Sequence, residues 1–237
     1  MNLDYIFPSP IWWVDLDIDL EEMERIVYHV ANTMEGKDRS NRGLLNYQSP
    51  DFMGEQVIND KELEGDEFQK LLIKIKEKAI EAFNSYGTPW TTIEYANAWI
   101  NINNNGGYNE VHTHPGAVMS GAFYVKVPEG ECGRLVFHRD ATEGYVLHSV
   151  GTSEDMSTAE VPHTHSTWSY PPVPGRLMLF PAWQAHGVRE NMTNEDRISI
   201  SFNFIPQRTR HDMMSIIKEN ESKSVPRAHQ ARIYSPE

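Results

Sequence analysis

Two histidines separated by one residue, His112 and His114, lie in the segment EVHTHPG, which begins at Glu110. In an extended strand, alternate side chains share a face, so both imidazoles and the carboxylate of Glu110 would point into the same space. Two imidazoles in this position could share one metal ion. The alternative is a pair of partly exposed histidines beside a Pro-Gly turn, because a chain with ten histidines contains such a spacing by chance.

A third histidine follows a separate apolar strand. In PVPGRLMLFPAWQAHGV, a Pro-Gly turn precedes the apolar segment 176–180, and His186 comes shortly after it. A third imidazole from a distant strand completes the half-open ligand set that iron(II) oxygenases use. The alternative for His186 is a histidine in a surface loop. A second pair, His163 and His165, lies in an irregular segment that positions ligands poorly and is the weaker metal candidate.

The segment RISISFNFI alternates strictly between polar and apolar residues. The polar face contains Arg197, Ser199, Ser201 and Asn203, and the other face is entirely Ile and Phe. The apolar face must lie in the core. The polar face is either open to water or lines a wet pocket, where an arginine can bind a carboxylate through two parallel hydrogen bonds. Ser and Asn in place of Lys and Glu favour the pocket.

Two amphipathic helices are predicted before residue 92. Apolar residues recur at steps of three and four over residues 20–34 and again over residues 68–83. Asp19 and Glu22 have the spacing of a capping box at the first helix, and Gly87 with Pro89 supplies the stop of the second. We expect both helices to cover a sheet.

From residue 93 the period changes to two. Tyr95, Asn97, Trp99, Asn101 and Asn103 fall on one face of the predicted strand, opposite small and apolar residues. The segments SGAFYVKV, GRLVFH, GRLMLFP and RISISFNFI follow as short strands between Gly and Pro turns, which predicts a β-sandwich or barrel with flanking helices. Residues 40–54 are predicted to form a long loop, and residues 140–174 a loop or irregular hairpin.

Composition limits the partners and the compartment. The formal net charge of −13 opposes binding to nucleic acid, and no apolar segment approaches the length of a membrane span. The single cysteine excludes an internal disulfide and fits a cytoplasmic protein. Trp12 and Trp13 are adjacent and cannot both face inward on a strand, so one of them packs on a helix or permits a homodimer.

The order H-x-H, then H, then R-x-S resembles the iron(II)- and 2-oxoglutarate-dependent oxygenases, in particular their prolyl hydroxylase-like branch. More closely, YIFPSPIW, SNRGLLNYQSPDF, NINNNGGYNEVHTHPGAVMSGAFYV and PGRLMLFPAWQAHGV, followed by RISISFN, together resemble one group of such oxygenases. The resemblance runs from about Tyr5 to Pro206. It implies a double-stranded β-helix, a jelly-roll or cupin-like fold with the N-terminal helices packed on one sheet.

The resemblance also implies a reaction and an iron site. The expected enzyme uses oxygen and 2-oxoglutarate to hydroxylate an unidentified substrate, a prolyl peptide or a small molecule, and releases succinate and carbon dioxide. We expect a single oxygenase domain, with an N-terminal part at 1–92, the β-helix at 93–206 and a C-terminal helix and tail at 207–237. The implied ligands of the iron(II) are His112, His114 and His186.

For 2-oxoglutarate, the resemblance implies that Arg197 binds the distal carboxylate and that Ser199 assists it. Tyr124 and Asn101, on neighbouring strands, are weaker candidates for the same cosubstrate. All four residues lie in segments predicted to be strands.

One position departs from the family pattern. Most of the superfamily has Asp or Glu where this chain has His114, and a carboxylate lowers the charge of a metal site by one unit relative to neutral imidazole. Glu110, or the more distant Asp140, could replace one histidine ligand. A second hypothesis follows from this departure, a non-catalytic cupin-like module that binds a metal or another ligand.

Overall fold

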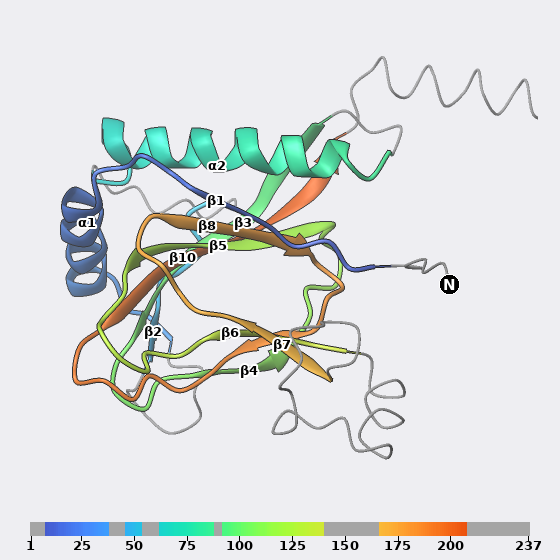
Figure 1. Ribbon diagram of the computed structural model, residues 1–237. Coiled ribbons are helices and arrows are strands. Elements are labelled where there is room, and N and C mark those ends of the chain that lie inside the picture. Colours follow the sequence, from blue (N-terminus) through green and yellow to red (C-terminus); the bar gives the residue numbers. More distant parts are fainter. Residues whose placement is uncertain (1–7, 38–45, 54–61, 88–91, 140–165, 208–237) are drawn as a thin grey trace, which may run out of the picture.

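The computed structural model describes residues 8–37, 46–53, 62–87, 92–139 and 166–207, which form two antiparallel sheets and two helices. The larger sheet contains, in order, β1 (Trp12–Asp15), β8 (Arg176–Pro181), β5 (Met119–Lys126), β10 (Arg197–Gln207), β3 (Thr92–Asn103) and β2 (Asn46–Gln48). The smaller sheet contains β4 (Asn109–His112), β9 (His186–Val188), β6 (Leu135–His138) and β7 (Thr167–Tyr170). Figure 1 shows the two sheets as separate layers. The predicted class, mainly β with flanking helices, is confirmed.

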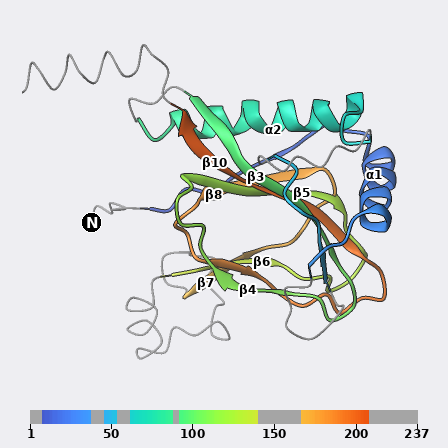
Figure 2. The same ribbon diagram turned by 180° about the vertical axis from the view of Figure 1, so that it is seen from behind.

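Both predicted helices form and pack on the larger sheet. Helix α1 spans Leu20–Thr33 and helix α2 spans Asp66–Asn84. Figures 1 and 2 show α2 over the side of the larger sheet that faces away from the smaller one. The predicted apolar stripe of α2 is buried and joins the main core with Ile100 and Phe202 of the sheet. This core fixes the sheet from outside, so the inner face of the sheet is free to carry polar residues.

Among the described residues, a small apolar cluster lies between the sheets. Its buried members are Tyr124, Leu135, Phe137, Met178 and Phe180. Asn101, Arg197, Ser199 and Asn203 are also buried, although their side chains are polar. Buried polar groups need hydrogen-bond partners or a ligand, so this inner layer is suited to a binding site.

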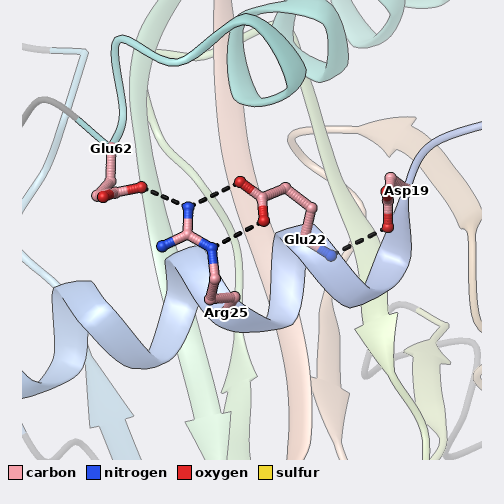
Figure 3. Close-up of polar contacts among 4 residues, drawn as sticks. All are labelled: Asp19, Glu22, Arg25 and Glu62. Carbon is pink, nitrogen blue, oxygen red and sulfur yellow. Dashed lines mark hydrogen bonds and ion pairs between the residues drawn. The ribbon is translucent and has the colours of Figure 1, made fainter.

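Helix α1 begins with half of the predicted capping box (Figure 3). The Asp19 carboxylate accepts a hydrogen bond from the Glu22 backbone N–H at 3.0 Å. The Glu22 carboxylate does not return to the Asp19 backbone and instead pairs with Arg25 at 2.7 Å. The Asp19 N–H donates to Glu67 of α2 at 3.0 Å. The reciprocal bond predicted from the Glu22 carboxylate to the Asp19 backbone N–H is therefore wrong. Arg25 binds the Glu22 carboxylate, and Glu67 accepts from the Asp19 N–H.

Replacing Asp19 with alanine is expected to lower the free energy of unfolding by about 1 kcal/mol, because the side chain caps the first turn of α1. Urea unfolding at pH 7 measures the loss. The matched control is Asp17→Ala, which removes an exposed acid two residues earlier and should change stability by less than about 0.5 kcal/mol. Equal effects of the two substitutions would contradict the capping role.

Strand β3 corrects one predicted face. The pairing of β10 with β3 steps from Asn97 to Tyr95 while β10 advances one residue, so a bulge interrupts the alternation at Ala96. The Tyr95 hydroxyl donates to the Leu72 carbonyl of α2 at 2.8 Å. Tyr95 thus lies against the helix and the main core. The prediction that Tyr95 and Trp99 share one face of the strand is wrong.

Two predicted loops contain short strands. Residues 46–48 of the 40–54 segment form β2, which pairs with β3, and residues 167–170 of the 140–174 segment form β7, which pairs with β6. Neither segment has a clear period, because three or four residues are too few to show one. Residues 140–165 of the second segment lie outside the described residues, and with them Asp140, His163 and His165. The predicted C-terminal helix also lies outside the described residues.

The adjacent tryptophans separate as the strand pattern predicts. Trp12 packs on Tyr86, which follows α2, with ring centroids 5.6 Å apart. Trp13 is exposed and stacks on the Arg176 guanidinium at 4.4 Å. Among the described residues, neither helix has the length and apolar character needed to cross a bilayer.

Candidate metal centre and adjoining pocket

The three predicted histidines lie together. His112 ends β4, His186 begins β9, and these two residues face each other in the strand pairing. His114 is held two residues beyond β4 by its backbone N–H, which donates to the Ala182 carbonyl at 2.9 Å. One ligand atom from each of the three side chains lies within 4.8 Å of the others. They are therefore placed to bind one metal ion.

Glu110 does not belong to this group. The pairing of β4 with β9 shifts register between Asn109 and His112, so the alternation expected for an extended strand fails at this point. In the described part of the chain, the metal-binding group comprises the three histidines without a carboxylate. The predicted position of Glu110 beside the imidazoles is wrong, and its cause is the irregularity in β4.

Backbone carbonyls orient two of the rings. His112 Nδ1 lies 2.7 Å from the Glu110 carbonyl oxygen, and His186 Nδ1 lies 2.8 Å from the Gln184 carbonyl oxygen. A carbonyl can only accept, so each Nδ1 carries the proton and Nε2 has the free lone pair that a metal needs. Both rings are thus set in a ligand-competent tautomer by the chain itself.

The third ring, His114, faces an amide. Its Nδ1 lies 3.4 Å from the Asn203 side-chain amide. That amide is fixed by Ser120 at 2.6 Å and by Asn97 at 2.7 Å. Asn203, on the predicted polar face of β10, therefore connects the metal group to a buried polar network.

Burial keeps two of the imidazoles neutral. It lowers the pKa of His186, which is 4% exposed, to about 3 and the pKa of His114 to about 4. The nearby imidazoles oppose protonation further. Neutral imidazole is the form that binds a metal, so these two residues need lose no proton at neutral pH.

The metal-free protein is expected to lose stability as the pH falls from about 6.5 toward 4. Over this range the unfolded chain binds protons on His114 and His186 that the folded protein excludes, so the free energy of unfolding decreases. Urea unfolding with a chelator at pH 7 and pH 5 measures the change. The double variant His114→Asn, His186→Asn should show a shallower pH dependence, and an unchanged dependence would contradict this origin.

A pocket of about 50 Å³ extends from the histidines between the two sheets. Its wall contains all four residues predicted to bind 2-oxoglutarate. The side-chain amide of Asn101 is already hydrogen-bonded within the protein, because its oxygen accepts from the Trp99 indole at 3.1 Å and its nitrogen donates to Ser201 at 2.9 Å. The complete set of predicted residues on the wall is His112, His114, His186, Arg197, Ser199, Tyr124 and Asn101.

Arg197 lines this pocket and is 2% exposed. Its Nη1 donates to the Gly133 carbonyl at 3.0 Å and its Nη2 donates to the Asn103 amide oxygen. Its Nε has no hydrogen-bond partner, and no carboxylate in the described residues pairs with it. Burial lowers the pKa of Arg197 and raises that of Tyr124 beside it. The guanidinium is therefore a desolvated cation that lacks an anion.

Two contacts of Arg197, Asn103 and Gly133, are not predicted from the sequence. Asn103 pairs directly with Arg197 across β3 and β10, so the correct strand register would have identified it. Gly133 contributes a backbone carbonyl, which leaves no side-chain pattern. Its φ of +93° and the 2.2 Å approach of an added Cβ to the Arg189 carbonyl oxygen require glycine there.

The large aromatic residues near the site divide into two groups. Trp99 and Phe180 line the pocket. Trp183 is 60% exposed and lies outside the pocket wall. Its ring lies beside Tyr86 on the surface, with centroids 5.8 Å apart, because the turn after β8 carries the side chain outward.

A family comparison matches the part of the chain that contains the site residues. Residues 97–203 match the family described as "Putative 2OG-Fe(II) oxygenase". The matched range contains the three histidines and Arg197. Comparison with curated proteins gives no match.

Solved structures of low sequence identity share the fold. An oxidoreductase of the 2OG-Fe(II) oxygenase family from Burkholderia pseudomallei is 14% identical with a TM-score of 0.52, and the match covers 78% of this chain and 76% of that one. The non-heme alpha ketoglutarate dependent epimerase SnoN from nogalamycin biosynthesis is 16% identical with a TM-score of 0.56, covering 84% and 77%. A prolyl-4-hydroxylase from Pseudomonas putida is 10% identical with a TM-score of 0.53, covering 84% and 94%.

These similarities confirm the double-stranded β-helix fold. Within that fold, the three histidines are placed to bind one metal ion. The family match is more specific, because it says that residues 97–203, which carry the site, are similar to the 2OG-Fe(II) oxygenases. The non-catalytic cupin-like alternative shares the fold and stays a second hypothesis.

Proposed function

We propose that this enzyme hydroxylates an organic substrate at the three-histidine centre, with oxygen as oxidant and with succinate and carbon dioxide as products from 2-oxoglutarate. The observation that carries the proposal is the placement of the histidines and the unpaired Arg197 on one pocket wall. His112, His114 and His186 hold the iron, and Arg197 binds the distal carboxylate with help from Ser199. Tyr124 and Asn101 contribute less to this binding.

The residues present fit both groups. Two imidazoles are held with Nε2 free, and burial keeps His114 and His186 neutral, which suits iron(II). Bound iron supplies the redox chemistry that couples oxidation of 2-oxoglutarate to oxidation of the substrate. At the other end of the pocket, the unpartnered Nε of Arg197 fits an incoming carboxylate oxygen. The dicarboxylate would thus supply the anion that the buried guanidinium lacks.

The absence of a carboxylate ligand affects how the cosubstrate binds. Three neutral imidazoles leave the full charge of iron(II) at the centre, one unit more than a site with two histidines and one carboxylate. This charge and that of Arg197 both attract 2-oxoglutarate, which is a dianion. We infer that the bound dianion offsets most of the positive charge of this pocket and leaves one positive charge that a carboxylate ligand would otherwise have neutralised.

Succinate formation tests the proposed function. Purified enzyme with iron(II), 2-oxoglutarate and oxygen should produce succinate slowly even without substrate, and NMR or mass spectrometry measures it. Omission of iron, or addition of a chelator, should abolish the product. A protein that binds no iron(II) under anaerobic conditions would overturn the proposal.

The remaining expectations concern substrate, partners and location. The substrate stays a prediction, a prolyl peptide or a small molecule, and so does the division into parts at 1–92, 93–206 and 207–237. The charge of −13 supports the expectation that nucleic acid is not a partner, and the single buried cysteine supports a cytoplasmic location. A homodimer also stays a prediction, which sedimentation velocity would test.

A further inference from the structure

The buried Arg197 is held by neutral groups alone among the described residues. Its two hydrogen-bond partners are the Gly133 carbonyl and the Asn103 amide oxygen. A buried charge normally pairs with an opposite charge, because desolvation without such compensation is costly. A neutral amide, rather than a carboxylate, next to this buried guanidinium is therefore unexpected for a purely structural arginine.

Asn103 has its amide orientation fixed from the other side. Its Nδ2 donates to the Asn46 amide oxygen at 2.5 Å, and the Asn46 Nδ2 in turn donates to the Tyr108 carbonyl at 2.8 Å. An amide has one donor end and one acceptor end, so the bond to Asn46 leaves the Asn103 oxygen directed at Arg197. Asn103 is 1% exposed, and water does not compete for these bonds.

The strand register sets this chain of contacts. Asn103 lies opposite Arg197 on β10 and opposite Asn46 on β2, since β3 runs between those two strands. Its backbone carbonyl also accepts from the Asn191 amide at 2.9 Å. The residue is thus fixed through both its side chain and its backbone.

We propose that Asn103 is a positioning residue for the cosubstrate: it orients the Arg197 guanidinium toward the pocket and, being uncharged, leaves the charge of Arg197 for the distal carboxylate. This inference rests on the proposed function, because it assumes that Arg197 binds that carboxylate. An aspartate at position 103 would have nearly the same shape but would pair with Arg197 itself. It would then act as an internal competitor of the cosubstrate.

Two probes separate this role from a merely structural one. 2-Oxoglutarate and 2-oxopentanoate have the same chain length and the same 2-oxo acid end, but only the first has a distal carboxylate. The wild-type enzyme, loaded anaerobically with iron(II), should bind 2-oxoglutarate more tightly. Calorimetry measures both dissociation constants. The constant for 2-oxopentanoate divided by that for 2-oxoglutarate gives a ratio that reports the contribution of the distal carboxylate alone.

Asn103→Asp is expected to lower this ratio by about tenfold or more, the effect of losing a hydrogen-bonded charged contact. Binding of 2-oxopentanoate and of iron(II) should stay within about threefold of wild type, since the variant leaves the metal centre intact. The matched control is Asn46→Asp. It adds the same charge at the residue that contacts Asn103 rather than Arg197, and the new carboxylate can still accept from the Asn103 amide. The ratio for this control should therefore fall less.

A second variant keeps the proposal testable if Asn103→Asp folds poorly. Asn103→Ala removes the orienting oxygen without adding a charge and should lower the ratio by several-fold. A wild-type ratio in both folded Asn103 variants would overturn the role of Asn103. A wild-type enzyme that binds the two acids equally, or an Arg197→Ala variant that keeps the ratio, would instead overturn the proposed function on which this role rests.

Discussion

Replacing His186 with alanine is expected to lower the affinity for iron(II) by more than a hundredfold. The substitution removes one of three imidazoles whose ligand atoms lie within 4.8 Å of one another. Loss of a group that merely supports a ligand costs roughly ten- to a hundredfold in metal affinity, so loss of a ligand should cost more. The His186 ring is also buried against Phe180, with ring centroids 4.5 Å apart.

Anaerobic equilibrium dialysis followed by metal analysis measures this effect. His29→Ala, which changes a histidine of α1 outside the metal group, should bind iron(II) as the wild type does. The same experiment on His114→Ala tests the ligand that replaces the usual carboxylate, and we expect a loss of similar size. One equivalent of iron bound with unchanged affinity in either site variant would contradict the ligand assignment.

Replacing Arg197 with alanine is expected to weaken 2-oxoglutarate binding by a hundredfold or more while iron(II) binding is retained. Two hydrogen bonds to a charged group in a buried site contribute about 1.5–3 kcal/mol each, and each 1.4 kcal/mol corresponds to a factor of about ten. Arg197→Lys should show a smaller loss, because lysine keeps the charge but lacks the planar pair of donors.

Calorimetric titration of the iron-loaded protein measures the dissociation constant. The matched control is Arg176→Ala, which removes an arginine that pairs with Asp15 at the edge strand β1 and lies outside the pocket wall. This control should bind 2-oxoglutarate within about twofold of wild type. If both arginine variants bind the cosubstrate equally well, Arg197 is not its anchor.

Long periodic segments determine most of what the sequence predicts correctly. The stripe along α2 repeats over five turns and the alternation along β10 over four residue pairs, so each has one orientation that buries its apolar side. The alternation along β10 places Arg197 on the polar face of that strand, which lines the candidate site. Histidine and arginine also have distinctive chemistry, and their grouping is therefore visible before the fold is known.

Irregular features account for what the sequence does not predict. Bulges at Ala96 and before His112 turn Tyr95 and Glu110 away from their expected faces, and a bulge adds one residue without a characteristic sequence signal. The partner of Asn103 depends on the pairing of β2, β3 and β10, which are distant in sequence. Long-range register is a property of the folded sheets and cannot be obtained from one strand alone.

An anaerobic titration of the iron(II)-loaded enzyme with 2-oxoglutarate, followed by visible absorption, tests the central claim most directly. If three imidazoles hold the iron and the cosubstrate reaches it with its far end on Arg197, a charge-transfer absorption should appear and saturate at one equivalent, and it should be lost in His186→Ala. If iron binds but the spectrum does not change with 2-oxoglutarate, the metal and the cosubstrate do not share this pocket and the account is contradicted.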